Sequence, residues 1–215
     1  MLANPSKVSD LFQLQEDATV LEKDLAEWQS HRDSNFNPRV VGQVNQSSDG
    51  SRPSVGYWPG KAEAYFDPYV AGVWNTSRTA RLLLISLILK LSSVMNDTAS
   101  NTYPHKEALV LVEDIIASIP YHLAGDLLSF LNESKRGKPL EPGRPVGGLL
   151  LMHPIYVAST LLIVPQGMQE YLKDCLSWIA INMGIGQASV FAKVDSLFLT
   201  LCPHFVQHIQ SNSVI

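Results

Sequence analysis

The chain has 215 residues, of which 46% are hydrophobic and 17% charged, with a formal net charge of −4. This composition suits one sizeable folded domain, or at most two small ones, and excludes a disordered chain. The longest apolar stretches, residues 82–89 and 149–164, are shorter than the roughly 20 residues that a membrane-spanning helix needs. The N-terminus has neither a signal-peptide nor a transit-peptide pattern, so we expect the chain in the nucleus or the cytoplasm.

The charge balance argues against direct binding of nucleic acid by this chain. Sixteen Lys and Arg face 20 Asp and Glu, whereas nucleic-acid-binding surfaces carry clustered basic residues in excess. Cys175 and Cys202 lie within apolar runs and are expected to be small core residues. His204 and His208 have a spacing that metal ligands use, but no third ligand lies nearby. We therefore predict no metal site and no cofactor in this chain.

The first predicted element is a helix over residues 8–32. Its apolar residues recur at alternating steps of three and four, namely Leu11, Leu14, Ala18, Leu21, Leu25 and Trp28. Such a seam is typical of an amphipathic helix that packs on a neighbouring core, with a coiled coil as the alternative. Residues 33–60 are rich in Asn, Gln, Ser, Gly and Pro, which predicts a long polar loop or linker. We assign residues 1–32 to the helix, 33–60 to the loop and 61–210 to a helical domain.

A long helix is predicted from Asp67 to about Met95, because an N-cap residue followed by proline is a typical helix start. The next helix is predicted over residues 105–119, with Pro120 ending it. Further on we expect a short helix or turn over residues 121–130. The last three predicted helices cover residues 149–164, 166–183 and 187–201, with Gly184 in the left-handed conformation after the second of them.

The predicted fold class is all-α, an array of about six to eight packed helices with a long polar loop near the N-terminus. Almost no window shows the alternation of a half-buried strand. Residues 146–215 contain only five charged side chains, so the C-terminal third is expected to be largely buried.

Arginines on the helix that begins at Asp67 are the first candidate site. Arg78 and Arg81 lie on one side of this mostly apolar helix together with Asn75. A buried arginine needs a carboxylate or backbone carbonyls as partners. We expect Glu113 or Asp114 on the following helix to supply them. Contact of these charges with a ligand is the alternative.

Catalytic signatures are not found: there is no G-x-S-x-G, no phosphate loop, no H-E-x-x-H and no C-x-x-C. His122 and His153 lie in apolar surroundings, where we interpret them as core or pocket-lining residues. The polar groups expected to line any pocket are Tyr121, His122, His153 and Tyr156. The alternative is an enzyme on a helical scaffold, with His122 or His153 as general base and a nearby carboxylate such as Asp126.

Four sequence blocks carry a resemblance to a known family, namely YFDPYVAGVWNTSRTARLLLISLI, EDIIASIPYHLAGD, GGLLLMHPIYVAST and MQEYLKDCLSWIAINMGIGQASVFA. In this order and with these gaps they resemble the C-terminal regulatory region of fungal zinc-cluster transcription factors, over about residues 10–200. The matching features include Trp74 followed by spaced arginines, paired glycines at Gly147 and Gly148, and Met183-Gly184-Ile185. None of these blocks is a catalytic signature.

The resemblance implies an all-helical region in the nucleus that regulates transcription, through protein partners, self-association or a small-molecule effector. We expect Trp74, Arg78 and Arg81, with Glu113 or Asp114, to fix two long helices relative to each other. In that family an N-terminal cluster of six cysteines holds two zinc ions and contacts DNA. This chain has two cysteines, so neither the zinc nor the DNA contacts transfer to any residue here.

Two interpretations of the missing cluster remain open: a fragment of a longer regulator, or a shortened protein that keeps only the regulatory helices. A further hypothesis is association with a membrane surface through the apolar C-terminal third.

Overall fold

The computed structural model describes residues 5–45, 52–95, 102–134 and 138–194. These residues form, in chain order, α1 (Pro5–Ser30), the 3-10 helix η1 (Ser34–Phe36), β1 (Arg39–Val44), β2 (Gly60–Ala64), α2 (Pro68–Val94), α3 (Thr102–Leu123), α4 (Leu127–Ser134), α5 (Pro145–Thr160), α6 (Gln166–Asn182) and α7 (Gly186–Lys193). The predicted array of packed helices is confirmed, and a small two-stranded sheet accompanies it. Within the described residues, no helix combines the length and apolar character needed to cross a membrane.

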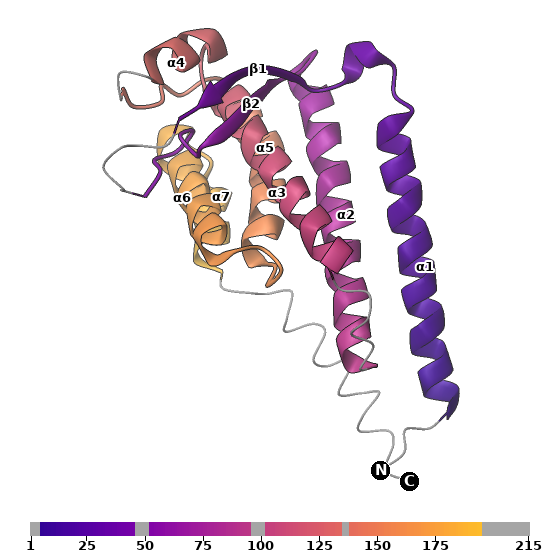
Figure 1. The fold of residues 1–215 in the computed structure, drawn as a ribbon. Coiled ribbons are helices and arrows are strands. Elements are labelled where there is room, and N and C mark those ends of the chain that lie inside the picture. The colour runs from indigo at the N-terminus through magenta and orange to yellow at the C-terminus, as the bar shows by residue number, and fades with distance from the viewer. Residues whose placement is uncertain (1–4, 46–51, 96–101, 135–137, 195–215) are drawn as a thin grey trace.

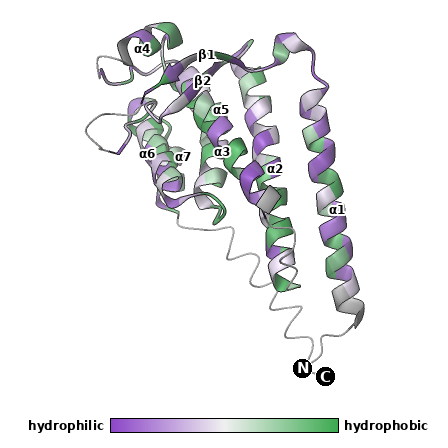
Figure 2. Ribbon diagram, in the orientation of Figure 1, coloured by the Kyte–Doolittle hydropathy of each residue, from purple (hydrophilic) through white to green (hydrophobic). Residues whose placement is uncertain are grey.

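The helices pack as a series of neighbours around one main core (Figure 1). α1 runs along α2, and α2 also packs against α3 and α5. α3 contacts α5, α5 contacts α6, and α6 contacts α7, while the sheet touches α3 through β2 and α4 through β1. Figure 2 shows many polar residues along α1 and mainly hydrophobic ones along the central helices. α1 is therefore an edge helix, and α2 connects it to the core.

The main core is built from fully buried aliphatic side chains of four helices. Leu82 of α2, Ile115 of α3, Ile155 of α5 and Leu172 of α6 are all inaccessible to solvent. Each such side chain contributes about 1.5–3 kcal/mol to folding. Cys175 is fully buried in the same core, and burial raises the pKa of its thiol well above the ordinary range. It packs there as a small apolar residue.

The local signals at the ends of α2 and α6 operate as predicted. The Asp67 carboxylate accepts a hydrogen bond from the backbone N–H of Val70 at 2.8 Å, and Pro68 is the first residue of α2. Gly184 follows α6 with φ of +70°, in the left-handed region. Because these features depend on a few adjacent residues, the sequence alone is sufficient to place them.

α3 does not end at Pro120, as the sequence predicts, but continues to Leu123 with this proline inside it. A proline within a helix removes one backbone donor and crowds the preceding turn. Ile119 and Leu123 are both fully buried, so packing of the last turn outweighs this local cost. α5 begins at Pro145, four residues before the predicted start, and this proline occupies the first turn, where its missing N–H costs nothing.

The segment 33–60 is not wholly a polar loop, because it contains η1 and β1. β1 pairs antiparallel with β2, from Arg39 opposite Ala64 to Val44 opposite Gly60. Most of β1 is exposed, so the strand lacks the apolar alternation by which strands are recognised in a sequence. The end of the segment is anchored by aromatic contacts, since the Trp58 ring lies 4.9 Å from that of Tyr171.

α7 ends at Lys193, and residues 195–201 of the predicted last helix lie outside the described residues. The same is true of Cys202, His204 and His208.

A close approach of α5 to α3 makes Gly147 a sensitive position. A Cβ atom there would fall far inside van der Waals distance of the His122 carbonyl oxygen. We expect Gly147→Ala to lower the free energy of unfolding by about 3 kcal/mol, because two backbones must move apart. Gly167→Ala is the matched control, since apart from the surrounding helix turn no atom of the described residues lies within 4 Å of the new methyl group, and its stability should be unchanged or rise by about 0.5 kcal/mol. Urea unfolding measures both, and equal stabilities would contradict this helix contact.

Candidate functional site: the arginine network of α2

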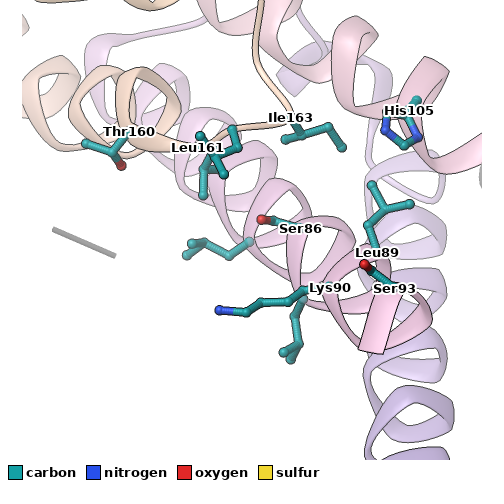
Figure 3. Close-up of a pocket in the computed structure, with 11 residues that line it drawn as sticks. Ser86, Leu89, Lys90, Ser93, His105, Thr160, Leu161 and Ile163 are labelled. Atoms are coloured by element: carbon teal, nitrogen blue, oxygen red, sulfur yellow. The ribbon is translucent and has the colours of Figure 1, made fainter. Parts of the chain in front are cut away.

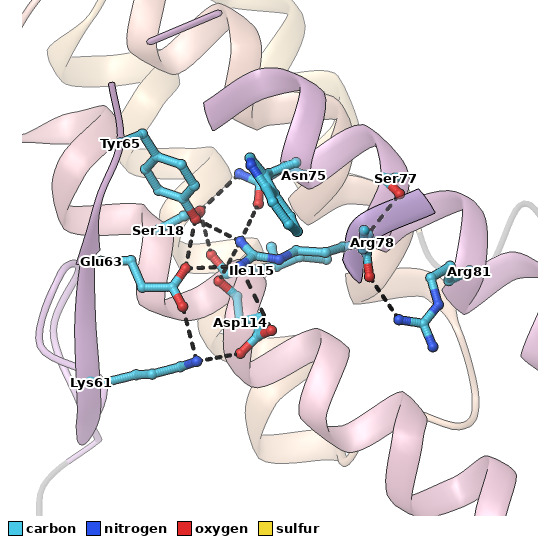
Figure 4. A network of polar contacts seen from close by, with 12 residues as sticks. Lys61, Glu63, Tyr65, Asn75, Ser77, Arg78, Arg81, Asp114, Ile115 and Ser118 are labelled. Carbon is cyan, nitrogen blue, oxygen red and sulfur yellow. Dashed lines mark hydrogen bonds and ion pairs between the residues drawn. The ribbon is translucent and has the colours of Figure 1, made fainter. Parts of the chain in front are cut away.

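Arg78 lies on α2 and is only 2% exposed. Its Nη2 donates to Glu63 Oε2 at 2.9 Å, and its Nη1 donates to the Tyr65 hydroxyl at 2.6 Å and to Asn75 Oδ1 at 3.1 Å (Figure 4). Nη1 also donates to the backbone carbonyl of Asp114 at 3.1 Å, and the Asp114 carboxylate is 3.7 Å from Nη2. One guanidinium group therefore joins α2 to β2 and to α3.

Glu63 supplies the buried counter-charge from β2, where it is 3% exposed. It accepts a hydrogen bond from the Tyr65 hydroxyl at 2.7 Å, and Lys61 Nζ lies 2.9 Å from its other oxygen. Burial raises the pKa of Glu63, but the charge of Arg78 and the hydrogen bonds from Tyr65 and Lys61 outweigh it, so the pKa lies below the ordinary value. Lys61 also pairs with Asp114 at 2.7 Å. Two cations thus face two carboxylates between β2, α2 and α3.

Arg81 lies one turn further along α2 and is 6% exposed. It joins α1 to α2. Its Nε donates to Glu22 Oε1 at 2.8 Å and its Nη1 to Gln29 Oε1 at 2.8 Å. Its Nη2 donates to Glu107 Oε1 of α3 at 2.7 Å. The expected partners, Glu113 or Asp114, are therefore wrong for Arg81.

The α1 surface that faces α2 combines polar side chains with part of the predicted apolar seam, since Ala18 is 5% exposed and the Trp28 ring packs beside that of Trp74. Gln15, Glu22 and Gln29 lie at intervals of seven residues, and Gln15 and Gln29 donate to serine hydroxyls of α2 at 2.7 and 3.2 Å. Leu14 and Leu21 of the predicted apolar seam are instead 36% and 50% exposed. Leu14 and Leu21 therefore lie outside the contact with α2, whereas Leu11, Leu25 and Trp28 of the same seam are half-buried.

Trp74 packs beside the network. Its indole N–H donates to the Phe36 carbonyl at 2.7 Å, and its ring centroid lies 6.3 Å from that of Trp28. The Arg78 guanidinium carbon is 5.7 Å from the Trp74 ring centroid. Glu113, by contrast, is exposed on α3. Among the residues expected to be architectural, Trp74, Arg78 and Asp114 come together, and Glu113 does not join them.

Sequence reasoning missed Glu63 and Glu22, which hold the two arginines. Glu63 lies 15 residues before Arg78 in a strand that the composition did not indicate, and Glu22 lies 59 residues before Arg81. From the sequence alone, Glu63 and Glu22 could not be distinguished from solvent-exposed acidic residues. The only signal in the sequence is that a buried arginine needs a carboxylate partner, and this requirement does not identify the carboxylate.

His122 is a buried residue of α3, 3% exposed, next to the arginine network. The amide of Asn75 lies 3.2 Å from His122 Nε2 and also donates to the Ser118 hydroxyl at 2.8 Å. Burial, together with the nearby positive charge of Arg78, lowers the pKa of His122 to about 4. The imidazole is therefore neutral at physiological pH. Tyr121 is half-buried, with its ring 5.3 Å from that of Tyr65.

The structure places the four residues expected to line a pocket in different surroundings. His153 is exposed on α5, and Tyr156 is buried with its ring stacked 4.4 Å from that of Phe191. A cavity of about 570 Å³ lies elsewhere, between the second half of α2 and residues 160–163, and none of the four lines it. Asp126 is exposed and caps α4 by accepting from the backbone N–H of Leu128 at 3.0 Å.

The interactions of this arrangement hold its elements together. Within the described ranges, no carboxylate pairs with His122 or His153, and no group of three potential metal ligands occurs. The site is a buried ionic network that sets the positions of α1, α2, α3 and β2. Fold and site together define a helical array organised by charges buried at α2.

Comparisons with known proteins relate this array to transcription factors. The chain is 48% identical over 199 residues to a protein named Transcription factor dbaG from Emericella nidulans. The aligned region covers 90% of this chain but 47% of that protein, so the chain spans about half the length of its relative. No family model and no solved structure matches the chain. Almost all of this chain is thus homologous to part of a fungal transcription factor.

Removal of Arg78 tests the network directly. We expect Arg78→Ala to lower the free energy of unfolding by about 3 kcal/mol, because Glu63 stays buried without its closest arginine. Arg39→Ala, at an exposed position of β1, is the matched control and should change stability by less than about 0.5 kcal/mol. Chemical denaturation measures both variants. A loss in Arg78→Ala no greater than in the control would contradict the stabilising role of the network.

The buried His122 predicts a dependence of stability on pH. Its pKa is about 4 in the folded chain, against an ordinary value of 6.5, so the unfolded chain binds a proton first as the pH falls. Stability is therefore lost between pH 6.5 and about 4, by about 3 kcal/mol from this group. His122→Gln should remove this contribution to the slope, and the exposed-site control His153→Gln should retain it. Urea unfolding across this pH range checks the result, and parallel curves for His122→Gln and the wild type would refute it.

Proposed function

We propose that this chain is a regulatory and interaction domain that takes part in transcription regulation in the nucleus, without a DNA-binding zinc cluster of its own. The observation that carries the proposal is the 48% identity, over 90% of the chain, to a protein named as a transcription factor. The net charge of −4 supports a role that does not depend on direct binding of DNA by this chain. The name of the relative also supports the nuclear location.

The domain works by packing in this proposal. Arg78 and Arg81 connect α2 with β2, α3 and α1 through buried ion pairs. A partner that shifts α1 acts on the Glu22–Arg81 contact and hence on the helix that holds β2 and α3. Binding can thus bias the arrangement of the whole array, provided that the partner prefers one arrangement over another.

Exposed apolar side chains on one side of α1 support the proposal of protein partners or self-association. Leu14 and Leu21, seven residues and thus two turns apart, lie on one side of α1 and are 36% and 50% exposed, while the neighbouring Gln15 and Glu22 contact α2. Exposed apolar side chains that adjoin one another on one side of a helix are typical of a contact surface. We therefore place the protein-binding surface of this domain on α1.

An enzymatic function is the less favoured hypothesis. A general base at His122 would have to take up a proton near neutral pH, whereas burial keeps the pKa of this residue at about 4. His153 is exposed and lies on a different helix. We propose a non-catalytic protein. Association with a membrane surface stays a separate prediction, which flotation with liposomes tests.

A tethering experiment tests the proposed function. We expect the chain, fused to an unrelated DNA-binding domain, to change transcription of a reporter that carries the site of that domain. The double variant Leu14→Glu/Leu21→Glu should lose this effect, because two charges disrupt the apolar surface. Gln13→Glu/Ser30→Glu adds the same charges at exposed polar positions of α1 and should keep it.

Thermal unfolding and immunoblotting show whether all three fusions are folded and equally abundant. A reporter that does not respond to the folded wild-type fusion would contradict the regulatory role. A full response from the Leu14→Glu/Leu21→Glu variant would contradict the assignment of the contact surface to α1.

A further inference from the structure

The cavity of about 570 Å³ has the size of a small-molecule site and lies outside the arginine network. One wall is the second half of α2, the facing wall is the segment that follows α5, and His105 of α3 lies at one side (Figure 3). Leu83, Leu87 and Leu89 of α2 line the cavity, together with Leu161, Leu162 and Ile163 of the segment after α5. The lining is therefore mainly aliphatic.

Three polar side chains interrupt this lining on α2. Ser86, Lys90 and Ser93 are spaced by four and three residues, so they follow one face of the helix. Figure 3 shows all three on the same wall of the cavity. A ligand in the cavity would thus meet a line of hydroxyl and ammonium groups flanked by leucine side chains on α2, and the aliphatic residues 161–163 on the facing wall.

The charge of the cavity is unbalanced. Lys90 is the single lysine or arginine among the lining residues, and no Asp or Glu is among them. Within the described parts of the chain, no carboxylate forms an ion pair with Lys90. The Thr160 hydroxyl, by contrast, donates to the Val157 carbonyl at 2.9 Å. The cavity therefore offers one positive charge that the described protein does not neutralise.

The apolar wall is also incomplete. Leu161 is 5% exposed, but its neighbour Leu162, which also lines the cavity, is 74% exposed. Covering such a side chain with apolar material is favourable by about 25 cal/mol for each Å² removed from water. An occupant with an apolar body gains from this wall, and an acidic group on the same molecule gains from Lys90.

We propose that this cavity binds an apolar small molecule that carries one anionic group. Lys90 is the counter-ion of that group, and the hydroxyls of Ser86 and Ser93 donate hydrogen bonds to it. The aliphatic side chains of α2 and of residues 161–163 hold the apolar part. This inference does not rest on the proposed role in transcription, because it concerns binding by the purified chain alone.

Two fluorescent probes with the same aromatic skeleton test both parts of the proposal. Anilinonaphthalene sulfonate carries a negative charge, and phenylnaphthylamine lacks the sulfonate. We expect both probes to bind the full chain saturably at one site. Lys90→Gln should weaken binding of the sulfonate about tenfold and binding of the neutral probe less than about twofold, because only the former loses a charged partner. Ser86→Phe should weaken both by filling the cavity.

Lys23→Gln, which removes the charge of an exposed lysine on α1, is the matched control and should bind both probes as the wild type does. Circular dichroism melts show that each variant is folded before it is titrated. Absence of saturable binding to the wild type would overturn the site. Equal losses for the two probes in Lys90→Gln would overturn the role of Lys90, and unchanged binding in a folded Ser86→Phe would place the probes elsewhere.

Discussion

The burial of two guanidinium groups on α2 is the constraint on which the arrangement of the other elements depends. A buried charge that loses its partner costs several kcal/mol, so each arginine requires its carboxylates in place. Arg78 holds β2 and α3 through Glu63 and Asp114, while Arg81 holds α1 and α3 through Glu22 and Glu107. The small sheet and the edge helix, which bury little apolar surface of their own, are thereby fixed to the hydrophobic core.

The sequence predicts those parts of the fold that depend on neighbouring residues. Asp67 and Pro68 mark the start of α2, and Gly184 marks the end of α6. The hairpin could not be predicted, because β1 is largely exposed and the fixed position of β2 depends on a distant arginine. α3 extends past Pro120 for a similar reason, since burial of the surrounding turn outweighs the local preference.

In the candidate site, too, some features follow from neighbouring residues and others only from tertiary packing. A buried arginine on α2 could be predicted from its apolar neighbours, and the need for a carboxylate followed from its charge. The identity of that carboxylate depends on tertiary packing, which placed Glu63 and Glu22 at the arginines and left Glu113 exposed. The histidines differ likewise, because helix orientation alone turns His122 inward and His153 outward.

α2 also connects the ionic network with the cavity. Its first half carries Arg78 and Arg81, and its second half carries Lys90 and Ser93 on the cavity wall. In that second half, Ser92 accepts a hydrogen bond from Gln15 of α1, so the turn that lines the cavity also holds the edge helix. A ligand that binds this turn more tightly when α1 is in place therefore stabilises the contact of α1 with α2. By linkage, a protein partner that favours the same position of α1 raises the affinity for the ligand by the same factor.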